Sequence, residues 1–187
     1  VNYARLTDRI PKDTHLDAHN ALNDYFIEHH GHSYRNGVFA TGDASEADSY
    51  GDTVRVIFPI GKFEFIWHDQ IQDLYDEVFS ATAGSDLLHA YAKSLGVDLR
   101  AVKKAFRDDT EERAKALEWI KTQTADPAFG IELFKFAMDT LGGYQSTDMI
   151  SAIHSQHEIM LWVPEYYAMT QPVAAQFSNW LQANRKK

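Results

Sequence analysis

Two aromatic residues, Phe39 and Tyr50, are spaced so that they can flank a flat ring. Phe39 lies in a short apolar run, Val38–Ala40, which predicts a strand. The next residues, Gly42-Asp43, predict a turn and a helix start, and the short helix ends at Tyr50. A strand followed directly by a helix brings the two rings near each other, and two aromatic faces can sandwich a planar ligand. The same pattern also fits a core aromatic on a strand and a half-buried tyrosine on a helix.

A single carboxylate, Glu158, begins an otherwise apolar run that ends at Pro164. Alternation along a strand places Glu158 on one face with Met160 and Trp162. A carboxylate in such a position is costly unless it reaches solvent or has a partner. Gln156 stands two positions earlier. The pattern makes Glu158 a candidate for electrostatic catalysis, and the alternative is a strand-edge glutamate that makes a surface contact.

These two segments resemble parts of the ADP-ribosyltransferase superfamily, whose fold is that of diphtheria-type toxins and poly(ADP-ribose) polymerases. In that superfamily a Gly-aliphatic-aromatic strand leads into a helix of small residues that ends in a ring-stacking tyrosine, as from Gly37 to Tyr50. A strand with Glu or Gln, any residue, Glu and then an aliphatic run matches Gln156 and Glu158.

The resemblance implies an α+β fold: an ADP-ribosyltransferase-like split antiparallel sheet with a helical insertion. It also implies that NAD is the substrate. Glu158 would then bind the ribose and stabilise its positive charge as the nicotinamide–ribose bond breaks, with Gln156 as the second catalytic residue. Phe39, Thr41 and Tyr50 would bind the nicotinamide end of the cofactor.

The same resemblance implies a cationic residue on the first strand that grips the dinucleotide, because an arginine fork suits pyrophosphate oxygens. Arg5 is placed best, on a predicted strand from Tyr3 to Leu6. Arg9 and Arg35 remain alternatives, and each of the three also fits an ordinary surface arginine.

Two features depart from the superfamily. There is no His followed by Gly-Ser or Gly-Thr, as in poly(ADP-ribose) polymerases, and Thr41 alone stands near the Ser-Thr-Ser position of arginine-specific toxins. The resemblance covers residues 3–68 and 145–170. The chain also resembles uncharacterised proteins of tailed bacteriophages through two stretches, Arg-Asn-Gly-Val-Phe-Ala-Thr-Gly and Ile-Phe-Pro-Ile-Gly.

The function that follows is an NAD-dependent mono-ADP-ribosyltransferase, a glycosyltransferase of bacteriophage origin that modifies a protein or other macromolecular acceptor. An NAD glycohydrolase would use the same site. The alternative is a catalytically inactive viral structural or interaction protein that retains the fold.

Composition limits the partners and the chemistry. The formal net charge of −9 argues against a duplex nucleic-acid binder, which needs a basic surface. The lack of Cys excludes disulfides and thiolate nucleophiles. No apolar run is long enough to span a membrane, so we expect a soluble protein in the host cytoplasm or the virion. His15 and His19 are four apart, but no Glu follows His15, and no metal site is predicted.

The length of 187 residues predicts a single domain over 1–187. Within it, residues 84–142 form a helical insertion in this interpretation, since apolar residues recur there at helical spacing. We expect these helices to pack beside the sheet and to carry no catalytic group.

Overall fold

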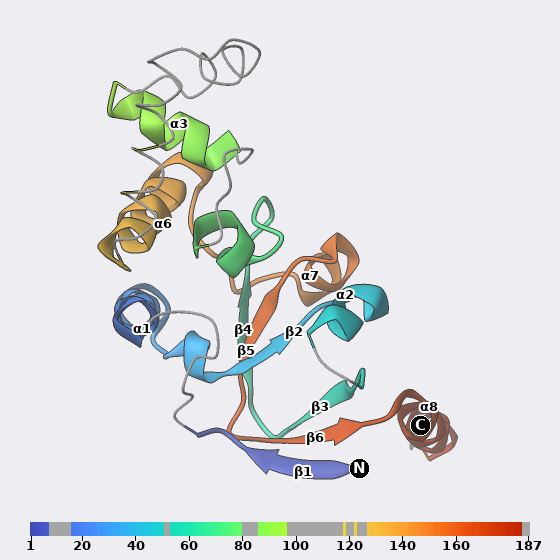
Figure 1. Cartoon of the computed structure of the whole chain (residues 1–187). Coiled ribbons are helices and arrows are strands. Elements are labelled where there is room, and N and C mark those ends of the chain that lie inside the picture. The colour runs from blue at the N-terminus through green and yellow to red at the C-terminus, as the bar shows by residue number, and fades with distance from the viewer. Residues whose placement is uncertain are drawn as a thin grey trace. The chain divides into compact units, whose positions relative to one another are not determined.

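A computed structural model describes residues 1–7, 16–50, 53–79, 86–96, 118, 122 and 127–184 (Figure 1). The chain divides into two compact units. Unit 1 comprises Val1–Arg9, Phe26–Asp69 and Gln145–Lys187, and unit 2 comprises Ile10–Tyr25 and Gln70–Tyr144. The predicted α+β class is confirmed, and all the described strands lie in unit 1, in two small antiparallel sheets. The predicted single domain stays a prediction.

The first sheet of unit 1 has the strand order β1-β6-β3. Strand β6 (Glu165–Met169) is central, with β1 (Asn2–Arg5) and β3 (Val56–Ile60) antiparallel on its two sides. Arg5 pairs with Glu165 at one end of this sheet. The central strand was not expected from the sequence, because Pro164 reads as a strand end.

The second sheet has the order β2-β5-β4 and carries the predicted site residues Phe39 and Glu158. Strand β5 (Ile159–Trp162) is central, between β2 (Val38–Ala40) and β4 (Glu64–Trp67). Phe39 on β2 lies opposite Met160, and Glu158 directly precedes β5.

Two strand pairs continue from one sheet into the other. The chain passes from β3 to β4 through a turn at Gly61, whose φ of +78° suits glycine, and from β5 to β6 through Val163-Pro164. Ile60 pairs with Glu165 on one side of this junction, and Glu64 pairs with Trp162 on the other. The segment from β3 to β4 therefore pairs with the segment from β5 to β6 in both sheets, and this pairing links the sheets.

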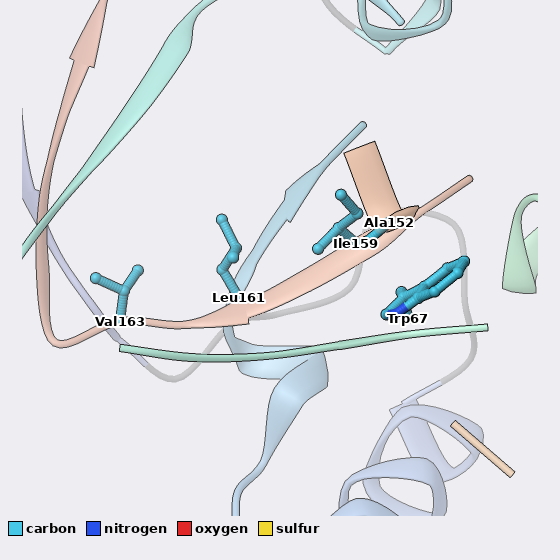
Figure 2. Close-up of a cluster of buried hydrophobic side chains, with 5 residues drawn as sticks. All are labelled: Trp67, Ala152, Ile159, Leu161 and Val163. Atoms are coloured by element: carbon cyan, nitrogen blue, oxygen red, sulfur yellow. The ribbon is translucent and has the colours of Figure 1, made fainter. Parts of the chain in front are cut away.

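One face of the β2-β5-β4 sheet is covered by apolar packing. Ile159 and Leu161 point to this face with Trp67 and Val163, and Ala152 from the helix α7 (Met149–Ser155) packs against them (Figure 2). All five residues are buried. Because side chains alternate along β5, Met160 and Glu158 belong to the opposite face. We call that opposite face the Met160 face.

The other short helices of unit 1 flank these strands. They are the 3₁₀ turn η1 (Tyr34–Asn36), α2 (Ala44–Ser49) and the C-terminal α8 (Gln171–Ala183). Asp43 caps α2 by accepting hydrogen bonds from the backbone N–H groups of Ser45 and Glu46. The longer helix α1 (Leu16–His30) belongs to unit 1 from Phe26 onward and to unit 2 before it.

The described part of unit 2 is helical. It contains a π-helical turn η2 (Tyr75–Phe79), α3 (Asp86–Ser94) and α6 (Pro127–Leu141). Tyr25 and Phe134 pack edge to face with their ring centroids 4.9 Å apart. Two of these helices fall within the predicted insertion 84–142. Residues 97–117 of the predicted insertion lie outside the described residues, so the insertion remains a prediction.

Candidate functional site

The Met160 face brings together three of the residues that the sequence singled out. Phe39 on β2 lies across from Met160, and Glu158 lies two residues before Met160 on the same face. Arg35 on η1 contacts both Phe39 and Glu158. The side chain of Glu158 is 13% exposed and that of Arg35 is 8% exposed, so these opposite charges meet in a largely buried place.

The guanidinium group of Arg35 lies between an aromatic ring and a carboxylate. Its central carbon is 4.7 Å from the ring centroid of Phe39, within the range of a cation–π contact. Its Nη1 atom is 3.7 Å from Oε1 of Glu158. Buried charges are stable only when they are compensated, so each of these two charges supports the other.

Gly37 explains how η1 comes close enough to the strand for this arrangement. A Cβ atom at Gly37 would overlap the backbone carbonyl oxygen of Leu161 on β5. The backbone N–H of Gly37 also donates to the carbonyl of Tyr34 and closes η1. Glycine at this position therefore lets η1 and β2 approach the central strand, which carries Arg35 toward Glu158.

Thr41 and Gln156 meet directly beside Glu158. The hydroxyl of Thr41 donates to the carbonyl of Gln156 over 2.8 Å and accepts from the backbone N–H of Asp43 over 3.1 Å. Gln156 has φ 65° and is the C-cap of α7, a place where a left-handed residue commonly ends a helix. Thr41 thus ties the β2–α2 turn to the end of α7, two residues before Glu158.

Gly42 shows how closely this junction is packed. A Cβ atom at Gly42 would overlap the carbonyl oxygen of Ile153 in α7. The β2–α2 turn and the last turn of α7 are therefore in backbone contact, immediately before the residues that lead into Glu158.

Tyr50 is far more exposed to solvent than Arg35 and Glu158. It ends α2 as the C-cap residue and is 64% exposed. Phe39, in contrast, is partly buried and has the guanidinium of Arg35 over its ring. The sandwich of Phe39 and Tyr50 around a flat ring stays a prediction, and it requires a ligand to reach the ring of Phe39 beside Arg35.

Arg5 lies on β1, in the other sheet. Its Nε atom donates to the hydroxyl of Tyr3 over 2.9 Å and lies 3.2 Å from a carboxylate oxygen of Glu165. The hydrogen bond to Tyr3 and then the charges of Tyr3 and Glu165 raise the pKa of Arg5. Its side chain is 70% exposed, and these contacts are within its own sheet. Its role toward a dinucleotide stays a prediction, and Arg9 lies outside the described residues.

A second polar and aromatic group on the Met160 face was missed from the sequence. His32 stacks on Trp162 with ring centroids 3.9 Å apart and planes 14° from parallel, and its Nε2 lies 3.4 Å from Oε1 of Glu64. Burial and the neighbouring Glu64 raise the pKa of Tyr34 to about 12. Alternation predicted Trp162 on the same face as Glu158. No sequence pattern predicted that His32, which follows α1, packs against Trp162.

Within the described ranges, no group of three or more His, Cys, Asp or Glu side chains could hold a metal ion. The described helices include none that is both long and apolar enough to cross a membrane. Comparisons with protein-family models, with curated proteins and with solved structures find no match.

Proposed function

We propose that this chain is an NAD-dependent mono-ADP-ribosyltransferase whose reaction takes place at Glu158. The observation that carries the proposal is a largely buried carboxylate beside an aromatic ring, at the head of the central strand β5. The two small antiparallel sheets are compatible with the split sheet that the sequence resemblance implies.

The geometry suits the cleavage of a glycosidic bond to a pyridinium ring. When that bond breaks, its electron pair goes to the nicotinamide nitrogen, which leaves as neutral nicotinamide, and the ribose C1′ becomes oxocarbenium-like. A fixed carboxylate stabilises this developing positive charge and accepts a hydrogen bond from a ribose hydroxyl. A nucleophile of the acceptor then bonds to C1′ and loses its proton. Water in that place gives ADP-ribose, the glycohydrolase reaction.

The residues present fit a planar cation. An aromatic face and a carboxylate are the two groups that attract one, and the guanidinium of Arg35 already makes both contacts. Thr41 holds Gln156 through its backbone carbonyl, two residues before Glu158. Under this proposal the side chain of Gln156 is the second catalytic group.

The second candidate is a viral structural or interaction protein that keeps this fold without activity. The observation in its favour is the same ion pair, because Arg35 already compensates the charge of Glu158 within the protein. The two candidates differ in one simple property, since only the first requires the chain to bind and cleave NAD.

The test is NAD turnover by wild-type protein and by Glu158→Gln. NAD binding is followed by calorimetry, and nicotinamide release by chromatography. The variant keeps a similar shape but loses the carboxylate charge, so at saturating NAD we expect it to release nicotinamide about 10²–10³-fold more slowly. Glu132→Gln, which removes an exposed carboxylate on α6, is the matched control and should behave as wild type. Equal turnover by Glu158→Gln, or no NAD binding by the wild type, would contradict the proposal.

A further inference from the structure

The guanidinium of Arg35 makes the two contacts that a planar cationic ligand would need. It lies over the ring of Phe39 and beside the carboxylate of Glu158, and its side chain is nearly buried. Guanidinium and pyridinium groups are both flat, delocalised and singly charged, and both are attracted by an aromatic face and by a carboxylate. They therefore compete for the same place.

We propose that Arg35 is a built-in occupant of the ligand site, and that a planar cation binds only when the guanidinium withdraws from Phe39 and Glu158. This inference rests on the proposed function, in which the ligand cation is the pyridinium ring of NAD. It assigns Arg35 a role opposite to gripping the dinucleotide: in the arrangement seen here, Arg35 keeps the site closed.

The location of Arg35 is compatible with such a movement. It belongs to η1, a three-residue turn, rather than to the sheet that holds the other two residues. Phe39 is fixed by pairing with Met160, and the backbone before Glu158 is fixed by the bond between Thr41 and Gln156. A rotamer change of one side chain would therefore expose the aromatic face and the carboxylate without breaking strand pairing.

The consequence for affinity is a matter of populations. A ligand that binds only the withdrawn state has an apparent dissociation constant raised by the inverse of that state's population. If Arg35 is withdrawn about one tenth of the time, its removal tightens binding about tenfold. A neutral planar ligand does not compete for the carboxylate in the same way, so its affinity should change less.

The experiment measures the affinity of two small probes by calorimetry. 1-Methylnicotinamide, which is methylated on the ring nitrogen, is a pyridinium cation, and nicotinamide is its neutral counterpart. Both are titrated into wild-type protein, Arg35→Gln, Arg35→Lys and Arg55→Gln. The last variant removes an exposed arginine next to β3 and serves as the matched control. Circular dichroism verifies that each variant is folded.

We expect Arg35→Gln to bind the cation about tenfold more tightly than the wild type does, with a smaller change for nicotinamide and none in the control. Arg35→Lys retains a charge near Glu158 but lacks the flat group, so it should show a smaller increase. If Arg35→Gln does not fold, the increase in Arg35→Lys decides the question.

Unchanged or weaker binding of the cation in both Arg35 variants would overturn the inference. If the wild type nevertheless releases nicotinamide from NAD, the proposed function stands and only the role of Arg35 falls. If no protein binds either probe and the wild type leaves NAD intact, both proposals fall.

Discussion

Arg35 and Glu158 should be strongly coupled in stability, and a double-mutant cycle measures that coupling. The variants are Arg35→Met, Glu158→Leu and the two together. Each single change leaves an uncompensated charge in a largely buried place, whereas the double change leaves two apolar side chains. The cycle therefore separates the interaction between the two charges from the cost of burying either one.

The magnitude follows from the distance. Two unit charges 3.7 Å apart attract by about 4.5 kcal/mol at an effective dielectric constant of about 20. Breaking a buried pair from one side typically costs about 3–5 kcal/mol, because the remaining charge keeps its desolvation penalty. We expect each single variant to lose an amount in this range and the double variant to lose less than either.

The assay is native-state hydrogen exchange of the β5 amides, which reports the free energy of opening the sheet that holds the pair. The matched control is the same cycle on Arg5 and Glu165, whose atoms are closer, at 3.2 Å, but solvent-exposed. Solvent screens that pair, so its coupling should be much smaller despite the shorter distance. Additive losses at Arg35 and Glu158, or a coupling no larger than the control's, would refute the argument that burial makes this pair important.

Two further changes test other parts of unit 1. Tyr34→Phe should remove a pH dependence of the free energy of unfolding. The pKa of Tyr34 in the folded protein, about 12, exceeds the ordinary value of 10.0. The stabilisation from its protonated hydroxyl is therefore complete below pH 10, and about 3 kcal/mol of it is lost as the pH rises from 10 to 12. Thermal melts at pH 9 to 11 check this, and equal slopes in variant and wild type would contradict it. Gly42→Ala should cost about 1–3 kcal/mol, because the added Cβ overlaps the carbonyl of Ile153. Gly143→Ala, where the nearest atom to a Cβ is 4.0 Å away, is the control for urea unfolding, and equal losses in the two variants would argue against close packing at the β2–α2 turn.

Local patterns were sufficient for β5 and for the segment that contains β2 and α2. Alternation from Glu158 to Val163 and the Gly42-Asp43 turn predicted β5 and the start of α2, because both signals depend on adjacent residues. Strand β6 was missed, since Pro164 interrupts the run although Tyr166 and Tyr167 favour a strand. The division into two sheets depends on long-range pairing, which no local pattern in this chain specifies.

The candidate site was predictable only in part for the same reason. Alternation put Glu158 on the Met160 face, and Phe39 was placed on a strand, but their common face follows from the register of β2 on β5. Arg35 was named as an arginine for the dinucleotide. Its contact with Glu158 arises from the close approach of Gly37 to Leu161, a tertiary feature.

The release of nicotinamide from NAD by the purified wild-type chain tests most directly whether Glu158 is a catalytic carboxylate. We expect nicotinamide to accumulate over repeated turnovers, with matching loss of NAD, and Glu158→Gln to lower the rate about 10²–10³-fold. NAD recovered intact after prolonged incubation with folded protein would contradict the assignment of Glu158 as the catalytic carboxylate.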